Sequence, residues 1–169
     1  CNDYLYVGDG TNQVTVTASS STPTLNVVGD FSIKNNATFV APTGLNKFSV
    51  GGSWSNEGTF EHNNGQVIFD AASSGKTIDT GGDDVGKRFY NVQFNNGSGG
   101  WTVQNNNIFA ENNFQLTDAS SFVMATSSWW DTNWSYRKQL TVSNPSSQTA
   151  SSGYQVSITL DHKALVDSG

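Results

Sequence analysis

The amino-acid sequence predicts an all-β protein with essentially no helix. We expect a right-handed parallel β-solenoid (β-helix) followed by a short, incomplete β-sandwich-like segment. One observation is a repeat, because the pattern of residues 25–31 (Leu-Asn-Val-Val-Gly-Asp-Phe) returns 23 positions later in residues 48–54 (Phe-Ser-Val-Gly-Gly-Ser-Trp). Another is that no window of about 11 residues has helical periodicity, whereas short stretches alternate apolar and polar residues. A period of about 20 to 25 residues is typical of stacked β-coils.

The chain divides by pattern into three parts. Residues 1–21 are expected to form a cap with the first strands, since Val14-Thr-Val16-Thr alternates and an end coil must cover an open core. Residues 22–127 contain the solenoid repeats, and residues 128–169 form a partial β-strand domain.

The repeat predicts a column of stacked aromatic residues in the core. Each copy ends in a Thr-Phe pair, so Phe31 should stack on Trp54 and Phe39 on Phe60. A looser third copy places Phe114 and Phe122 eight residues apart, which is the spacing of Phe31 and Phe39. Gly29 and Gly52 occupy equivalent positions, where we expect a bend with unusual backbone angles.

Further short strands are expected between residue 65 and residue 124. The alternating stretches are residues 65–69, 76–78, 89–94, 101–103, 108–109, 114–116 and 122–124. Asn105-Asn-Asn107 indicates a corner, because Asn tolerates the left-handed backbone conformation.

Composition and charge exclude some classes of partner. The chain is 35% hydrophobic and 13% charged, with a formal net charge of −6. Nucleic acids and anionic membranes require a basic surface, so neither is an expected partner. No apolar run approaches the roughly 20 residues that a membrane-spanning helix needs. Cys1 is the only cysteine, and it marks either a processing boundary or a site of lipid attachment or of a bridge to another chain.

The sequence contains no clear metal or catalytic motif, and we expect no cofactor. Asp9 lies in a turn that suggests calcium, but a solvated turn explains it better because the other carboxylates are missing. The pair Asp83-Asp84 also suggests calcium, but it lacks the repeated Gly-Gly-x-Gly-x-Asp spacing of calcium-binding β-rolls, which favours a solvated loop. The closely spaced acids of the repeat, Glu57, Glu61 and Asp70, are the candidates for a polysaccharide-degrading enzyme of the β-helix type. They fall in turns or at outward positions, which favours a protein that is not an enzyme.

Residues 22–125 resemble the Gly- and Asn-rich repeat regions of large bacterial or archaeal surface proteins. The matching pieces are Val50-Gly-Gly-Ser-Trp54-Ser-Asn-Glu-Gly58-Thr-Phe60, Gly65-Gln-Val67-Ile-Phe69 and Phe89-Tyr-Asn-Val92. The resemblance implies a parallel β-helix that serves as a stalk or adhesive shaft at the cell surface or outside the cell.

Aromatic residues gather at the start of the carboxy-terminal segment. The cluster contains Trp129, Trp130, Trp134 and Tyr136, followed by Arg137-Lys138. This Trp-x-x-x-Trp-x-Tyr-Arg-Lys opening is similar to that of an uncharacterised β-sandwich family of surface proteins. The alternating stretches at 139–142 and 154–160 are too few to close a sandwich. Therefore either the chain continues beyond Gly169 or these strands pair with another subunit.

Two functions from different classes follow. The first is a structural role, as a rigid shaft or self-assembling fibre subunit whose partners are identical copies or further domains of the same polypeptide. The second is a glycan-binding adhesin, in which Trp129, Trp130, Trp134 and Tyr136 stack on sugar rings. The competing interpretation of this cluster is that its rings seal the end of the solenoid.

Overall fold

The structure is a computed structural model that describes residues 4–18, 24–106 and 108–124. The chain divides into two compact units, Cys1–Ser127 and Ser128–Gly169, and every described residue belongs to the first. The first unit is a parallel β-solenoid of about five turns, which confirms the predicted fold class.

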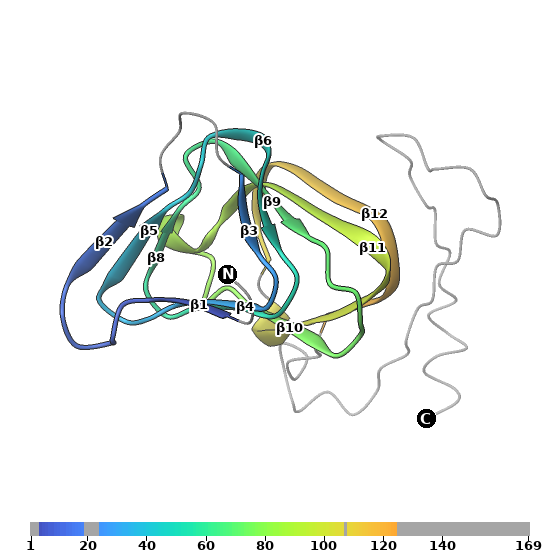
Figure 1. Cartoon of the computed structure of the whole chain (residues 1–169), viewed down its shortest axis with the longest axis horizontal. Helices are drawn as coiled ribbons and strands as arrows, with labels where there is room; N and C mark the ends of the chain where they lie inside the picture. The colour runs from blue at the N-terminus through green and yellow to red at the C-terminus, as the bar shows by residue number, and fades with distance from the viewer. Residues whose placement is uncertain (1–3, 19–23, 107, 125–169) are drawn as a thin grey trace, which may run out of the picture. The chain divides into compact units, whose positions relative to one another are not determined.

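Twelve strands form the solenoid (Figure 1). In chain order they are β1 (Tyr4–Val7), β2 (Val14–Thr17), β3 (Leu25–Val27), β4 (Asp30–Ile33), β5 (Ala37–Val40), β6 (Gly44–Val50), β7 (Trp54–Asn56), β8 (Thr59–Glu61), β9 (Gly65–Phe69), β10 (Lys76–Asp79), β11 (Phe89–Val103) and β12 (Ala110–Met124). All strand pairs are parallel, and each strand pairs with its counterpart one coil away in the sequence.

The strands stack into three walls. Wall A consists of β3, β6, β9 and the first halves of β11 and β12, and wall B of β1, β4, β7, β10 and the second halves of β11 and β12. Wall C contains β2, β5 and β8, which form a separate sheet on the left of Figure 1. Because β11 and β12 run through both wall A and wall B, the two walls join there into one sheet.

Helix is confined to two 3₁₀ turns in the described part of the chain. These are η1 (Val85–Lys87), which follows β10, and η2 (Gln104–Asn106), which links β11 to β12. Neither is long or apolar enough to cross a membrane.

The core consists of columns of apolar side chains, one residue from each coil. Wall A carries two columns: Leu25, Phe48, Val67, Val92, Phe114; and Val27, Val50, Phe69, Phe94, Leu116. Wall B carries the column Leu5, Phe31, Trp54, Ile78, Val103, Met124. The ring centres of Phe31 and Trp54 are 4.7 Å apart, and those of Phe39 and Phe60 on wall C are 6.4 Å apart. Most of these side chains are fully buried, so each coil is held by the coils on both sides of it.

The looser third copy of the repeat does not stack on the first two copies as predicted. Phe114 lies opposite Val92 on wall A and Phe122 opposite Trp101 on wall B, whereas Phe31 and Phe39 lie on walls B and C. The eight-residue spacing was therefore misleading, because β12 spans two walls in one continuous strand.

The corners depend on Asn and on close backbone contacts. Asn36, Asn46, Asn63, Asn64 and Asn105 have positive φ angles, as expected for Asn at tight turns. Gly29 and Gly52 both lie in bends, as expected, but neither has a positive φ. Instead, a Cβ atom on Gly52 would collide with the backbone of Gly29 and Asp30 in the preceding coil. Close stacking of the corner, and not backbone conformation, requires glycine at residue 52.

Candidate functional site

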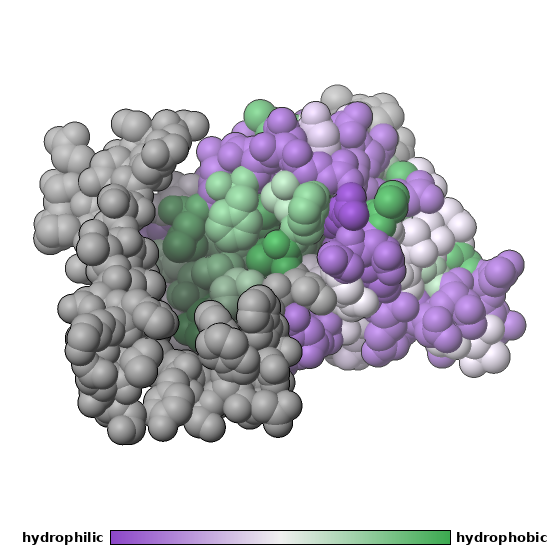
Figure 2. Space-filling view, turned by 180° about the vertical axis from the view of Figure 1, so that it is seen from behind, coloured by the Kyte–Doolittle hydropathy of each residue, from purple (hydrophilic) through white to green (hydrophobic). Residues whose placement is uncertain are grey.

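The carboxy-terminal end of the described solenoid exposes both a strand edge and part of the core. β12 pairs with β11 on one side only, so the other edge of this 15-residue strand has no partner strand in the described structure. Its inward-facing side chains Phe114, Leu116 and Met124 are 43%, 52% and 39% exposed. Seen from behind, hydrophobic residues gather in one area beside a polar surface (Figure 2). An unpaired edge beside exposed apolar residues favours addition of another strand.

The opposite end is better covered. The edge strands β1 and β3 lie on walls B and A, the two walls that β12 continues at the other end. Val7 and Val27 are buried there, whereas Val14 and Val16 of β2 on wall C are about 40% exposed. The two ends thus present strand edges on the same walls and in the same direction.

Wall C ends earlier than the other two walls. After β8 the next coil contributes η1 in place of a strand, and the Nζ of Lys87 donates hydrogen bonds to the carbonyl oxygens of Asn56 and Gly58 at 3.0 and 2.5 Å. The amide of Asn56 in turn donates to the carbonyl of Gly86. Asn56 ends β7 and Gly58 lies in the corner before β8, so these bonds satisfy backbone groups of that corner and hold η1 against it. Burial lowers the pKa of Lys87, and the nearby carboxylates of Asp79, Asp84 and Glu57 oppose this shift.

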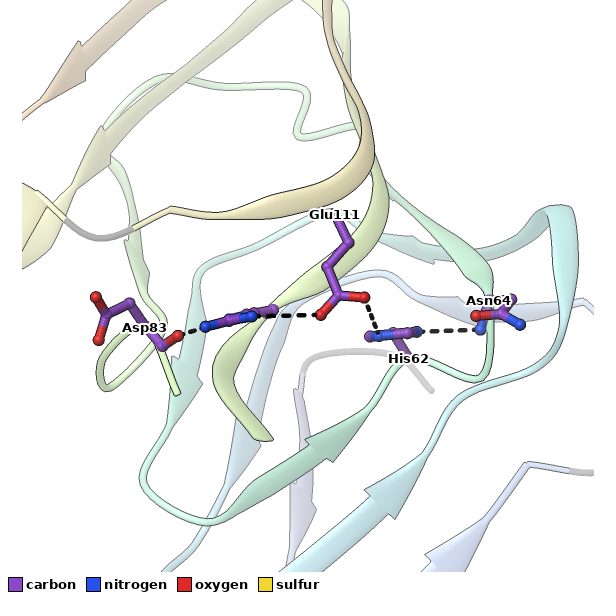
Figure 3. Close-up of polar contacts among 5 residues, drawn as sticks. His62, Asn64, Asp83 and Glu111 are labelled. Atoms are coloured by element: carbon purple, nitrogen blue, oxygen red, sulfur yellow. Dashed lines mark hydrogen bonds and ion pairs between the residues drawn. The ribbon is translucent and has the colours of Figure 1, made fainter. Parts of the chain in front are cut away.

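One corner carries a polar cluster from three parts of the chain (Figure 3). The carboxylate of Glu111 on β12 lies 3.3 Å from His62 Nε2 and 3.7 Å from the guanidinium of Arg88. Arg88 also donates through Nε to the carbonyl of Asp83 at 2.7 Å, and it lies over the ring of Phe109.

This cluster contains the residue types of an acid–base site, but the ring nitrogens of its histidine already have partners. His62 Nδ1 accepts a hydrogen bond from the backbone N–H of Asn64 at 3.1 Å, and Nε2 faces Glu111. Both ring nitrogens are therefore engaged, so neither is free to take a proton from a substrate or to bind a metal. The ring also stacks on Tyr90, with centres 5.4 Å apart. We interpret the cluster as a structural contact that holds β12, the last described strand, to the earlier coils.

Two of the three acidic residues considered from the sequence have a polar side-chain partner nearby. Glu57 lies 3.4 Å from Lys34, and the carboxyl of Asp70 receives a hydrogen bond from Ser49. The exposed Glu61 ends β8 on wall C. These three acids thus belong to different walls and corners, and the structure does not bring them together around one groove.

The turn at Asp9 is held by its own backbone. Asp9 Oδ1 accepts hydrogen bonds from the N–H groups of Thr11 and Asn12, and Oδ2 accepts one from the Asn12 side chain. These bonds lower the pKa of Asp9 to about 2. In the described ranges, no three His, Cys, Asp or Glu side chains are grouped so that they could hold a metal ion.

The predicted aromatic cluster Trp129, Trp130, Trp134 and Tyr136 lies outside the described residues, as do Cys1 and the alternating stretches of residues 139–160. The exposed end at β12 and the role of Lys87 were not predicted from the sequence. The available signal for the first was the run of apolar residues Phe114, Leu116, Phe122 and Met124 in a polar context.

The chain was compared with protein-family models, with curated proteins and with solved structures, and none of the three comparisons gives a match. The functional argument therefore rests on the geometry of this chain.

Proposed function

We propose that this chain is a non-enzymatic structural protein, namely a rigid shaft or a fibre subunit that stacks end to end. The observation that carries the proposal is the uninterrupted parallel ladder, which within the described ranges leaves strand edges without a partner strand on walls A and B at both ends. The setting is the cell surface or the extracellular space, in keeping with the surface-protein repeats that residues 22–125 resemble. Identical copies or further domains of the same polypeptide are the proposed partners.

The core supports a shaft because its columns run through every coil. Rings such as Phe31, Phe39, Phe48, Trp54 and Phe60 are in mutual contact, with centres 4.7 to 6.4 Å apart. Close-packed interiors resist compression, and each coil contacts only its neighbours. A body built in this way lengthens by adding coils, and walls A and B continue from one coil to the next.

The ends support stacking because they match in wall and direction. The first half of β12 would pair with β3 of the next copy, and the second half with β1. Such a head-to-tail contact uses two different surfaces, so it does not close and propagates into a filament. Wall C takes no part, because in the described residues its sheet ends at β8 and the next coil contributes η1 in place of a strand.

Two variants of the same strand test end-to-end stacking. Leu116 and Val123 are 52% and 50% exposed, but Leu116 faces the core side, opposite Phe94, whereas Val123 lies opposite Thr102 on the outer side. We expect wild type to form larger species as its concentration rises in sedimentation velocity, and filaments in electron micrographs. Leu116→Lys should abolish both, because it places a charge in the stacked core.

Val123→Lys is the matched control and should assemble as wild type does. The proposal of stacking fails if wild type stays monomeric over a wide concentration range. It also fails if the two variants have the same effect.

The adhesin alternative stays a prediction from the sequence. It requires that Trp130→Ala and Trp134→Ala remove glycan binding without loss of the fold. The enzyme alternative predicts glycan cleavage that Glu61→Gln abolishes, and the dispersed positions of Glu57, Glu61 and Asp70 give it no support.

A further inference from the structure

A groove lies on the outside of wall B and encloses about 280 Å³. We call it the wall-B groove and define it by the side chains that the argument uses: Tyr6, Asp30, Ser32, Ser55, Thr77 and Asp79. They alternate with core residues such as Phe31 and Ile78, and therefore point to the outer side.

The groove is elongated along the solenoid axis. The strand register places Tyr6 beside Ser32, Ser32 beside Ser55, and Ser55 beside Asp79, one residue from each of four successive coils. Gln104, after β11, lines the groove beyond Asp79. At about 4.8 Å per coil, the distance from the coil of Tyr6 to the coil of Gln104 is roughly 19 Å. A linear ligand fits this shape better than a compact one.

Backbone hydrogen bonds orient the polar groups of the groove. Asp30 Oδ1 accepts from the N–H of Ser53 at 2.7 Å, and Asp79 Oδ1 accepts from the N–H of Gly81 at 2.9 Å. The second oxygen of each carboxylate remains to accept a hydrogen bond from a ligand. Ser53 Oγ accepts from the N–H of Thr77 at 3.1 Å, so its hydroxyl hydrogen is left to donate. The groove thus offers acceptors and donors in fixed positions.

Ser32 forms part of the floor of the wall-B groove. It is only 4% exposed and lines the groove, and its Oγ has no hydrogen-bond partner among the described atoms. The Oγ atom itself has almost no exposed surface, so Ser32 shapes the floor of the groove, and the hydrogen bonds to a ligand come from the more exposed polar groups around it.

An aromatic ring lies at one end of the groove. Tyr6 is 55% exposed, its ring stacks on that of Tyr4 at 4.8 Å, and Lys34 Nζ lies 5.6 Å from its centre. A ring held in this way presents an apolar edge and a phenolic hydroxyl together.

We propose that the wall-B groove binds a linear, uncharged oligosaccharide that lies along the solenoid axis. Sugar hydroxyls both donate and accept hydrogen bonds, so they match a surface that alternates carboxylates with serine and threonine hydroxyls. The groove also contains Lys34, but this side chain pairs with Glu57 at 3.4 Å, so the two carboxylates Asp30 and Asp79 still disfavour acidic polysaccharides and phosphates. The polar lining disfavours an apolar ligand. This binding role goes beyond the proposed shaft function and does not depend on it.

A second groove, on wall A, supplies the control. It encloses about 380 Å³ and is lined by Asn26, Ser49, Ile68 and Asp70, among others. The apolar side chain of Ile68 lies beside Ser49 in the strand register and interrupts the row of polar groups. Asp70 is therefore an acid in a comparable groove that the proposal does not involve.

The test is calorimetric titration of the full chain with cellohexaose, xylohexaose and mannohexaose, and with hexagalacturonate as the acidic comparator. At least one neutral hexasaccharide should bind, and hexagalacturonate should not. Asp30→Asn with Asp79→Asn should weaken binding about tenfold, because charge-assisted hydrogen bonds become neutral ones. Each Asn retains an oxygen for the N–H of Ser53 or Gly81, so the fold is expected to persist.

The controls separate this groove from other sites. Asp70→Asn should leave the affinity unchanged, and Tyr6→Phe should retain more of it than Tyr6→Ala. Circular dichroism checks that every variant is folded. The proposal is overturned if none of the neutral hexasaccharides binds, or if hexagalacturonate binds equally well. It is also overturned if binding survives in the double Asp variant but is lost in Trp130→Ala with Trp134→Ala.

Discussion

At the scale of single residues, Asp70 shows how the lateral surface influences stability. The carboxyl follows β9 on wall A, and partial burial raises its pKa, although a hydrogen bond from Ser49 opposes the shift. A raised pKa in the folded state means that the fold holds this proton more tightly than the unfolded chain does. The contribution of Asp70 to stability therefore falls as the pH rises from the ordinary pKa of an aspartate, 3.8, through the raised pKa of the folded state.

We predict that Asp70→Asn raises the melting temperature at about pH 7 but has little effect at about pH 3. At neutral pH the variant removes the cost of a partly buried charge, whereas at low pH Asp70 is already protonated. Thermal denaturation at both pH values checks this. Asp83→Asn, in an exposed turn, changes the net charge equally and should not reproduce the difference; equal shifts at both pH values would contradict the reasoning.

At the scale of elements, η1 determines where wall C ends. A strand edge left bare at β8 would invite pairing with another chain, and proteins often cover such edges. Here the backbone turns into a 3₁₀ segment, and the Lys87 side chain reaches the carbonyls of Asn56 and Gly58. η1 therefore ends the parallel pairing of strands on wall C after β8.

A substitution of Lys87 measures how much its hydrogen bonds contribute to the stability of the fold. We predict that Lys87→Met lowers the free energy of unfolding by about 1–3 kcal/mol, since two carbonyls lose their donor. Chemical denaturation gives the measurement. Lys34→Met is the control, because the Lys34–Glu57 pair is partly solvated and such pairs contribute less than about 1 kcal/mol. A larger loss for Lys34→Met would refute the assigned role.

The individual strands also show which parts of the fold could be predicted from the sequence. β4 to β9 were expected because the alternation is regular and the turns contain Gly or Asn. The length of β11 was not, because the run Gly97-Ser-Gly-Gly100 is typical of a turn. In the structure the chain passes this corner in extended form, since Gly99 approaches the carbonyl of Ala71 and the ring of Trp101 too closely for any side chain. Such contacts between coils are invisible in a local pattern.

At the scale of the whole solenoid, stability should fall toward the carboxy-terminal edge. Phe48 and Phe114 belong to the same column, but Phe48 is 1% exposed and Phe114 is 43% exposed. Phe48 has coils on both sides, and in the described structure Phe114 has a coil on one side only. The sequence repeat was enough to predict the candidate residues that stack in the interior. It could not predict the exposed end, because that depends on where the strands of each wall stop.

We predict that Phe48→Ala lowers the free energy of unfolding by about 3–5 kcal/mol and that Phe114→Ala costs less than half of that. The difference arises because truncation of a buried ring leaves a cavity, whereas truncation of an exposed ring does not. Urea denaturation of both variants measures it. Equal losses would mean that Phe114 is covered in solution.

The register of the walls also bears on how the protein is made. Residues paired between adjacent coils are separated by only 19 positions for Phe48 and Val67 and by 26 for Tyr4 and Asp30. Each new coil therefore needs only the coil synthesised just before it as a template. The polypeptide can fold turn by turn while it is still emerging from the ribosome, without waiting for its distant end.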